Sequence, residues 1–277
     1  MSTSLWWIML LAGSCVGSFI NVVVWRLPRE ESVVWPGSHC PHCGHSVQWH
    51  DNIPVIGWLS LGGQCRDCRQ PISARYPVVE TLTAGLWLSA FWAVGFNTNP
   101  VSTDTVTALT TLGGGVVLIS LLMPLVLIDI DHLWLPEPIC RAGVIAGLVA
   151  TALVTAFGEA QNTALLFNHL LASAGGLLAL EAVSALAERL VGQPALGLGD
   201  AKLAAMAGAW LGIAGLGVAI GIAVFSGALF GVIARISGHL KPREPFPFGP
   251  FIALGIWLVW LMGSQWWWNQ WMALVSP

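Results

Sequence analysis

The chain has 277 residues, of which 56% are hydrophobic and only 9% are charged, and its mean hydropathy is +0.74. A soluble domain of this length carries roughly a quarter charged residues, so the composition excludes a soluble globular protein and indicates an integral membrane protein. The formal net charge is −3, and no basic patch is interleaved with aromatic residues, which argues against a nucleic-acid partner.

Apolar stretches of nearly membrane-spanning length recur along the chain. An α-helix needs about 20 apolar residues to cross a bilayer, and stretches of this length favour helices over barrel strands. We therefore predict an all-α polytopic membrane protein with about eight transmembrane helices. The predicted spans lie near residues 5–25, 78–95, 107–128, 139–157, 166–187, 201–213, 215–235 and 249–266.

Two of these spans need an argument of their own. No basic residue precedes the apolar run from Leu5 to Trp25, unlike in a signal peptide, so we interpret this run as a retained first helix. The stretch 201–236 is long for one span and short for two. Because Lys202 and Arg235 lie at its two ends, an even number of crossings is favoured, and the glycine-rich region 212–217 can supply the turn.

The basic residues orient the chain. With eight spans, all of them fall on one side of the membrane, which the positive-inside rule makes cytoplasmic, with both termini periplasmic. The loops near 97–104 and 158–161 on the other side contain no basic residue. Trp6, Trp7 and Trp266–Trp268 suit an aromatic belt at that outer surface. The basic residues are Arg26, Arg29, Arg66, Arg69, Arg75, Arg141, Arg189, Lys202, Arg235, Lys241 and Arg243.

The loop between the first two spans carries two Cys-x-x-Cys pairs. They are Cys40 with Cys43 and Cys65 with Cys68, separated by about 21 residues as in a four-cysteine zinc ribbon. Each pair presents two sulfurs, and four converging thiolates suit tetrahedral zinc. We predict a structural zinc site in a small ribbon-like loop. The predicted cytoplasmic location disfavours two disulfides.

Other readings of this loop stay open. An iron site or free thiols are alternatives, and histidines close to the cysteines allow a mixed ligand set. These histidines are His39, His42, His45 and His50. Cys15 and Cys140 fall in or at the ends of apolar spans, where small core residues are expected.

Acids near two span ends are candidate catalytic groups. Asp129 and Asp131 end the third span and Asp200 begins the sixth. Carboxylates at membrane depth are costly and therefore suggest function. Structural alternatives are a helix cap for Asp200 and solvated interfacial positions for the other two. Because the acids share one side of the membrane, we favour a pair that activates water, one ionised and one protonated. No serine or cysteine nucleophile motif competes.

Taken together, these motifs resemble those of bacterial type IV prepilin peptidases, membrane aspartyl proteases of the GxGD type. The likeness covers nearly the whole chain. The segments that carry it are Gly17–Asn21, Arg26–Pro28, the cysteine loop, Asp51–Pro54, Arg75–Glu80, Leu127–Pro136, Gly197–Lys202 and Pro245–Pro250.

The resemblance implies the site residues. It places the catalytic aspartates on Asp129 and Asp200, with Asp131, two positions after the first, as the main ambiguity. Glu137 stands where the family commonly has aspartate. Glu80 is a candidate for contacting the cofactor, the substrate or its free amine, and a plain helix-start carboxylate is an equal alternative.

The resemblance also implies the reaction and its place. Members cleave the basic leader of type IV prepilins and type II secretion pseudopilins at the cytoplasmic face of the inner membrane. Many then N-methylate the new terminus with S-adenosylmethionine. This sequence has no dinucleotide-binding βαβ pattern, so any cofactor pocket must form between the cysteine loop and the helix ends.

We accordingly predict three parts: a first transmembrane helix (1–25), a cytoplasmic zinc-binding loop domain (26–77) and a membrane-embedded peptidase domain (78–277). The competing functional hypothesis is a proton-coupled transporter that uses paired intramembrane acids. Such proteins often show internal repeats and acids near the midplane, and neither is evident here.

Overall fold

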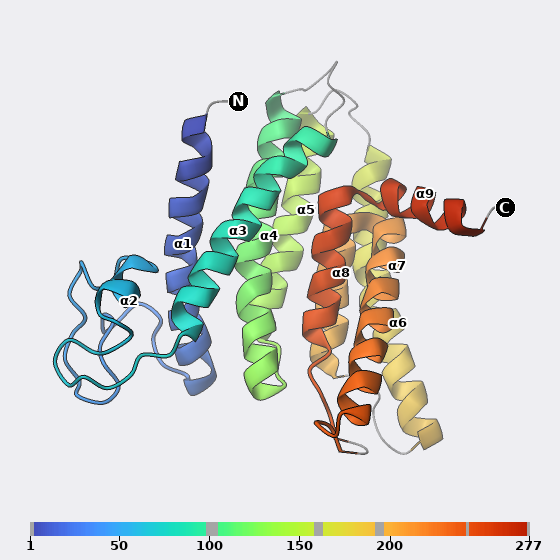
Figure 1. Ribbon diagram of the computed structural model, residues 1–277. Helices are drawn as coiled ribbons and strands as arrows, with labels where there is room; N and C mark the ends of the chain where they lie inside the picture. The colour runs from blue at the N-terminus through green and yellow to red at the C-terminus, as the bar shows by residue number, and fades with distance from the viewer. Residues whose placement is uncertain (1–2, 98–104, 158–162, 192–196, 242–243, 276–277) are drawn as a thin grey trace. The chain divides into compact units, whose positions relative to one another are not determined.

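The computed structural model describes residues 3–97, 105–157, 163–191, 197–241 and 244–275 (Figure 1). In these ranges the chain is almost wholly helical outside the cysteine loop and contains no strand longer than an isolated bridge, which confirms the predicted all-α class. The chain separates into two compact units, residues 1–92 and 93–277. We describe each unit by itself.

The first unit is built from two apolar helices and the cysteine loop between them. Helix α1 spans Thr3–Arg26 and α3 spans Arg75–Asn97, with the short helices η1 (Leu27–Arg29) and α2 (Ile56–Ser60) in the loop. The two long helices approach closely at glycines. A Cβ built on Gly13 would lie 2.9 Å from the Cα of Ala84, and one on Gly17 would lie 2.7 Å from the Cα of Glu80. Small residues allow such close packing of membrane helices.

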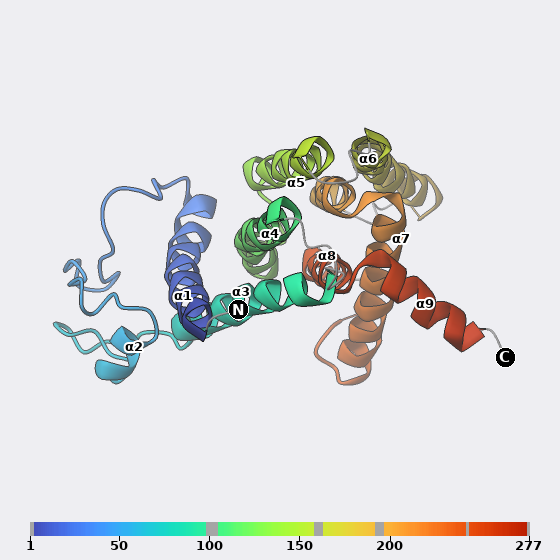
Figure 2. The ribbon, with the colours of Figure 1, turned by 90° about the horizontal axis from the view of Figure 1, so that it is seen from above.

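The second unit is a helical bundle. Its elements are α4 (Thr105–His132), α5 (Glu137–Phe157), α6 (Thr163–Val191), α7 (Leu198–Ile236), α8 (Gly249–Met262) and α9 (Ser264–Val275). The first part of α7 is the core of this unit, because Leu203, Ala204 and Met206 have no exposed surface. Seen from above, this part lies among α4, α5, α6 and α8 (Figure 2).

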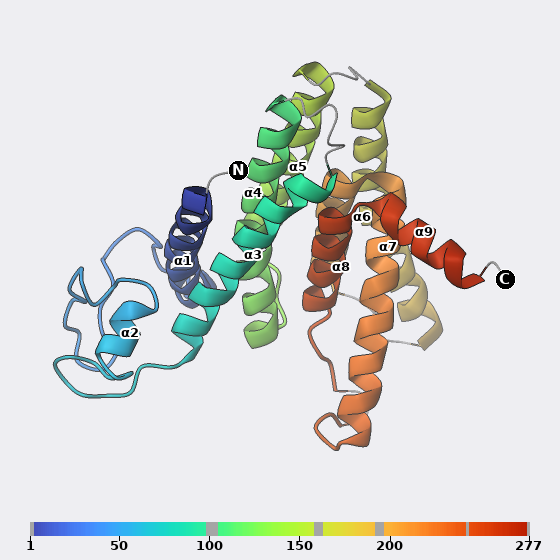
Figure 3. The same cartoon turned by 45° about the horizontal axis from the view of Figure 1, so that its top comes forward.

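Helix α7 is two helices joined at a sharp break. Gly212 has φ 67° and ψ −177°, a conformation that only glycine adopts readily. The segment before Gly212 runs away from Gly199, which packs on Leu135. The segment after it returns along α8, with Gly215 near Val259 and Gly227 near Phe248. Figure 3 shows the long returning segment. The stretch 201–236 therefore forms two helices, as predicted, with the turn inside the expected glycine-rich region 212–217.

Polar side chains of α6 satisfy the backbone at this break. The Ile213 N–H donates to Asn168 Oδ1 at 3.0 Å, and His169 Nδ1 lies 2.9 Å from the Ala209 carbonyl oxygen. Inside a membrane, backbone groups freed by a helix break need such partners. The break therefore explains why an Asn–His pair occurs within the apolar α6.

Eight helical segments of the described structure correspond to the eight predicted spans. Six helices are long and apolar enough to cross a membrane, namely α1, α3, α4, α5, α6 and α7; the break in α7 and the shorter α8 supply the other two. The predicted end of the last span is wrong. A span over 249–266 was expected, but α8 ends at Met262 because Gly263 adopts φ 79°, and α9 starts a new direction.

Candidate active site and metal centre

Asp129 lies in the last turn of α4 and is 5% exposed. Its Oδ2 accepts a hydrogen bond from the Gly249 N–H at 2.9 Å. A Cβ built on Gly249 would lie 2.7 Å from that same oxygen, so only glycine permits this approach. Residue 249, at the start of α8, thus holds one carboxylate oxygen of Asp129 in place.

The segment that carries Gly249 is fixed by aromatic packing. Phe246 and Phe251 contact Phe230 of α7 with ring centroids 5.8 and 5.5 Å apart, and Phe248 packs on Gly227. These contacts anchor the proline-rich turn against the returning segment of α7. The motif therefore positions a backbone donor, a role that sequence reasoning missed. The signal was present in its glycine, which follows directly after Phe248.

Asp200 lies in the first turn of α7 and is 8% exposed. Its Oδ2 accepts the Gly197 N–H at 3.0 Å and so contributes to capping its own helix. The N-cap is Gly197, with Asp200 at the third helical position, whereas the structural alternative had made Asp200 itself the cap. Oδ1 of Asp200, like Oδ1 of Asp129, has no hydrogen-bond partner among the described residues. Capping therefore uses only Oδ2 of Asp200 and leaves Oδ1 available to a substrate or to water.

Leu135 brings the two acidic motifs together. Its side chain contacts Gly199, which precedes Asp200, and also Gly249, which binds Asp129. The two carboxylates are near enough to interact electrostatically. Two acids that are 71 residues apart in sequence therefore lie at one end of the second unit, as predicted.

The neighbouring charged residues have different environments. Asp131 is exposed, whereas Asp129 is buried on the same helix end. Glu137, at the start of α5, accepts a hydrogen bond from Lys202 Nζ at 2.7 Å and also pairs with Arg141. Because Lys202 is two residues after Asp200, this ion pair ties the start of α7 to α5.

The four predicted cysteines of the first unit converge. The sulfurs of Cys40, Cys43, Cys65 and Cys68 all lie within 4.8 Å of one another, and no disulfide joins them. Cys40 Sγ and Cys68 Sγ are 3.8 Å apart, close to the roughly 3.8 Å separation that tetrahedral zinc with bonds of about 2.3 Å requires. The donor set fits a four-thiolate metal ion.

The two Cys-x-x-Cys turns have matching backbones. Gly44 N–H donates to the Cys40 carbonyl in one turn, and Arg69 N–H donates to the Cys65 carbonyl in the other. Both donors have positive φ, 74° at Gly44 and 60° at Arg69. Each turn is closed by an isolated bridge, His39 with Ser46 and Gln64 with Pro71. This geometry presents the sulfurs of each turn on the same side.

Without a cation the four thiols do not ionise alike. Backbone N–H groups, first that of Cys43, lower the pKa of Cys40 to about 6. The pKa of Cys43 rises to about 12; the His45 N–H lowers it, but desolvation and the neighbouring thiols outweigh that effect. One thiolate thus opposes formation of a second. A bound cation would compensate four negative charges, which is why such sites couple metal binding to proton release.

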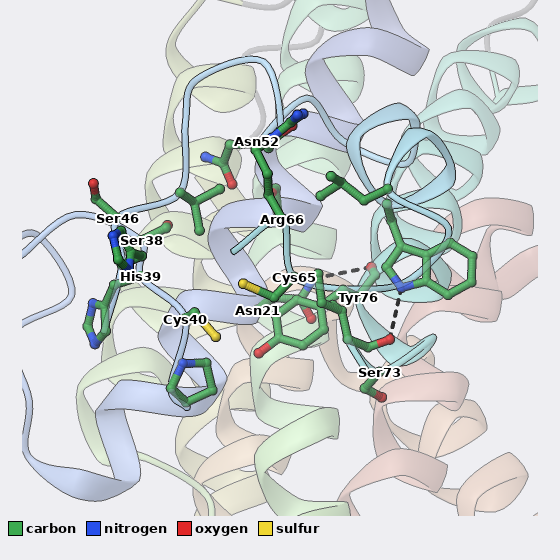
Figure 4. A pocket seen from close by; sticks show the side chains of 18 of the residues that line it. Asn21, Ser38, His39, Cys40, Ser46, Asn52, Cys65, Arg66, Ser73 and Tyr76 are labelled. Atoms are coloured by element: carbon green, nitrogen blue, oxygen red, sulfur yellow. Dashed lines mark hydrogen bonds and ion pairs between the residues drawn. The ribbon is translucent and has the colours of Figure 1, made fainter. Parts of the chain in front are cut away.

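A cavity of about 420 Å³ opens beside the cysteine cluster (Figure 4). Its lining includes Glu80, Asn21 and Tyr76 from the two helices, together with Cys40 and Cys65. Glu80 is 6% exposed and accepts the Val55 N–H at 2.6 Å. The structure therefore contains a pocket between the cysteine loop and the helix ends, where the sequence argument expected any cofactor pocket.

Two residues that line the same cavity form a bidentate ion pair. Arg66, inside the second Cys-x-x-Cys turn, donates to both oxygens of Asp51 at 2.7 and 2.6 Å. This guanidinium lowers the pKa of the Asp51 carboxyl. The segment after Asp51 continues to Val55, which binds Glu80. One short stretch of loop thus connects the cysteine cluster with the carboxylate in the cavity.

The fold and the sites define a class: a polytopic helical membrane protein with a buried pair of aspartates and a four-cysteine centre. Comparison with known proteins identifies the family. Residues 11–94 match the bacterial peptidase A24 N-terminal domain, and residues 116–232 match the type IV leader peptidase family.

Curated relatives agree over most of the chain. A prepilin leader peptidase/N-methyltransferase of Pseudomonas aeruginosa is 34% identical, covering 92% of this chain and 90% of its own. One of Myxococcus xanthus is 37% identical over 85% of this chain and 65% of its own. In Escherichia coli, a type 4 prepilin-like proteins leader peptide-processing enzyme is 33% identical, with coverages of 88% and 89%. No solved structure matches the chain.

The chain therefore belongs to the type IV prepilin peptidase family of membrane enzymes. The family resemblance inferred from the motifs is confirmed.

Proposed function

We propose that the chain is an aspartyl endopeptidase that cleaves the leader of type IV prepilins and type II secretion pseudopilins, with Asp129 and Asp200 as its catalytic pair. The observation that carries the proposal is the meeting of these two buried carboxylates at one end of the second unit, each with one oxygen held by a glycine N–H. The relatives' names supply the prepilin substrates, and the family resemblance of the motifs adds the pseudopilins.

The chemistry follows from two carboxyls that share one proton. The ionised member takes a proton from water, whose oxygen then attacks the scissile carbonyl carbon. The protonated member donates a hydrogen bond to the carbonyl oxygen. As the C–N bond breaks, the leaving amine receives the proton that the first carboxylate took from water. Low exposure favours such sharing, because two adjacent charges are costly away from water. Gly249 and Gly197 each hold an Oδ2 atom, which leaves Oδ1 of each acid for these transfers.

The site is proposed to face the cytoplasm. Lys202 contacts Glu137 at the end of the second unit that carries the acid pair, and Arg141 lies on the same turn of α5. The other end, where α8 passes into α9, has no basic residue over 264–277. The positive-inside rule then places the acids at the inner face and both termini in the periplasm, with the bacterial inner membrane as the location. A basic prepilin leader would approach from that side.

We further propose that methyl transfer to the new N-terminus occurs at the 420 Å³ cavity. Its volume is within the roughly 300–1,000 Å³ of ordinary small-molecule sites. S-adenosylmethionine, when bound, would supply an activated methyl group on its sulfonium. Glu80 is the residue assigned to bind and orient the new N-terminus, because a buried carboxylate complements an ammonium group. The carboxylate can also take the proton that the ammonium must lose before the neutral amine accepts the methyl group.

Zinc is proposed as the metal of the four cysteines, in a structural role. All four ligands come from the protein, which leaves no open position for a substrate. In this proposal residues 26–77 form the zinc-binding domain between the first helix (1–25) and the peptidase domain (78–277).

One experiment tests cleavage and methylation together. Purified protein is incubated with a prepilin and S-adenosylmethionine, and the product's mass is measured. We expect loss of the leader followed by the gain of one methyl group, and neither with Asp200→Asn. Cleavage without added methyl would refute the methyltransferase proposal alone. An uncut prepilin would refute the peptidase proposal. Proton uptake by proteoliposomes holding the protein would instead support the transporter alternative.

A further inference from the structure

Helix α9 has no counterpart among the predicted spans. Gly263, with φ 79° and ψ 144°, ends α8, and its N–H caps the Val259 carbonyl at 2.9 Å. The chain then continues as α9, a helix of 12 residues. Figures 1 and 2 show α9 turning away from the axis of α8 and extending outward from the bundle. Trp267 fixes the junction, since its indole N–H donates to the Leu258 carbonyl at 3.2 Å.

The side chains of α9 divide into two faces. At 3.6 residues per turn, Trp267, Trp268 and Trp271 lie on one face, and Gln265 and Asn269 lie toward the other side. These two amides are 3.4 Å apart along the polar face. Trp268 and Trp271 are 55% and 62% exposed, so the bundle does not cover them.

Composition points to lipid as the partner of the apolar face. Tryptophan is enriched at membrane–water interfaces, where its ring lies among the headgroups and its N–H finds water. Residues 264–277 contain no charge, which makes burial in the headgroup region inexpensive. Helix α9 also begins directly where an apolar membrane helix ends, so its first turn is already at the boundary of the hydrocarbon.

We propose that α9 lies flat in the bilayer interface, with Trp268 and Trp271 inserted among phospholipids, and anchors the end of α8 at that surface. Helix α8 has 14 residues and is therefore about 21 Å long at 1.5 Å per residue. The hydrocarbon core is about 30 Å thick. If α9 lies at one interface, α8 is about 9 Å shorter than the hydrocarbon core. Gly249, at the other end of α8, then lies about 9 Å inside the opposite interface unless the bilayer thins there. The anchor thus sets the depth of the Gly249 N–H and of Asp129, which binds it.

Photo-crosslinking on the full-length protein in phospholipid vesicles tests the placement. A photoreactive amino acid replaces Trp271 on the apolar face or Asn269 on the polar face, and adducts are identified by mass spectrometry. We expect phospholipid adducts at position 271 to exceed those at 269 several-fold. Equal adducts at the two positions, or a crosslink from 271 to a second copy of the chain, would overturn the proposal.

A matched pair of tryptophan substitutions tests the anchoring. With the photoreactive group at position 271, Trp268→Gln should lower the phospholipid adduct several-fold, because it removes a neighbouring anchor from the same face. Trp266→Gln is the control, because Trp266 lies on the polar side of α9, and it should leave the phospholipid adduct unchanged. If both substitutions have the same effect, the apolar face is not what binds lipid. None of these readouts depends on peptidase activity.

Discussion

Asp129 and Asp131 are separated by one residue, yet only Asp129 is buried and bound by Gly249. We therefore predict that Asp129→Asn and Asp200→Asn each lower leader cleavage by about 10²- to 10⁴-fold, the range for loss of a general acid or base. Asp131→Asn should retain most activity. Cleavage is measured by the shift of a prepilin band, with membrane insertion checked for each variant. An inactive Asp131→Asn together with an active Asp129→Asn would reverse the assignment.

Gly249 offers a separate test of the site. Gly249→Ala should sharply reduce cleavage, because the added Cβ would lie 2.7 Å from Asp129 Oδ2 and displace it from the backbone donor. Gly221→Ala is the control, since no atom lies within 4 Å of the Cβ built there. Cleavage rates and thermal stability of both proteins are compared in detergent. If Gly249→Ala cleaves at the normal rate, the Gly249–Asp129 hydrogen bond has no catalytic importance.

The metal site makes an independent prediction. Cys65→Ala removes one of four converging ligands, so the purified protein should hold much less than the one zinc per chain expected of the intact site. Cys140→Ala changes a buried cysteine outside the cluster and should keep the metal. Elemental analysis measures zinc directly. Cleavage should fall less in Cys65→Ala than in Asp129→Asn. Equal zinc in both cysteine variants would exclude the four-thiolate site.

At the level of elements, periodicity and motif spacing predicted most of the fold but not how the helices end. The ends of α3 and α5 fall within three residues of the predicted spans, because long apolar runs are a strong signal. The premature end of α8 depends on the positive φ of Gly263, and a glycine in an apolar run does not reveal whether it is helical or left-handed. Sequence therefore indicates where breaks are possible but not which glycine makes them.

In the candidate sites, too, sequence predicted the features with a local signal and missed those that depend on tertiary packing. The cysteine cluster and the acid pair were predictable, because ligand spacing and carboxylates in apolar sequence are local signals. The Gly249 donor and the Asp51–Arg66 pair were not, since each joins segments whose approach depends on tertiary packing. Backbone donors carry no side-chain signature, so sequence reasoning found the acids and missed what holds them.

The break in α7 yields the element-scale prediction. Gly212→Ala should destabilise the protein by about 1–3 kcal/mol, because its backbone conformation suits only glycine and its Cβ would lie 2.3 Å from Asn168 Oδ1. Gly217→Ala, a helical position with no atom within 4 Å of the built Cβ, should be neutral or stabilising by about 0.5–1 kcal/mol. Thermal unfolding in detergent distinguishes them. Equal melting temperatures would show that α7 continues straight through residue 212.

For the whole molecule, the arrangement of charge predicts the orientation in the membrane. The second unit presents Lys202 and Arg141 at the end that carries the acid pair, while the uncharged α9 occupies the other end. Two short segments, α8 and the part of α7 before Gly212, begin at the end of the second unit that carries Asp129 and Asp200. A short hydrophobic length thins the bilayer locally, which would let water reach Asp129 and Asp200 from the cytoplasmic side.

Cysteine labelling of intact cells tests this orientation in a variant whose native cysteines are replaced. Single cysteines beside Arg29, Arg189 and Lys241 should react with a membrane-impermeant maleimide only after the inner membrane is opened, because basic flanks stay in the cytoplasm. A cysteine at Gln270, on the exposed side of α9, should react once the outer membrane alone is permeabilised. Reaction of the Arg29 position from the periplasm would invert the topology. The leader of a prepilin, which is basic and remains in the cytoplasm, would then have no access to the aspartates.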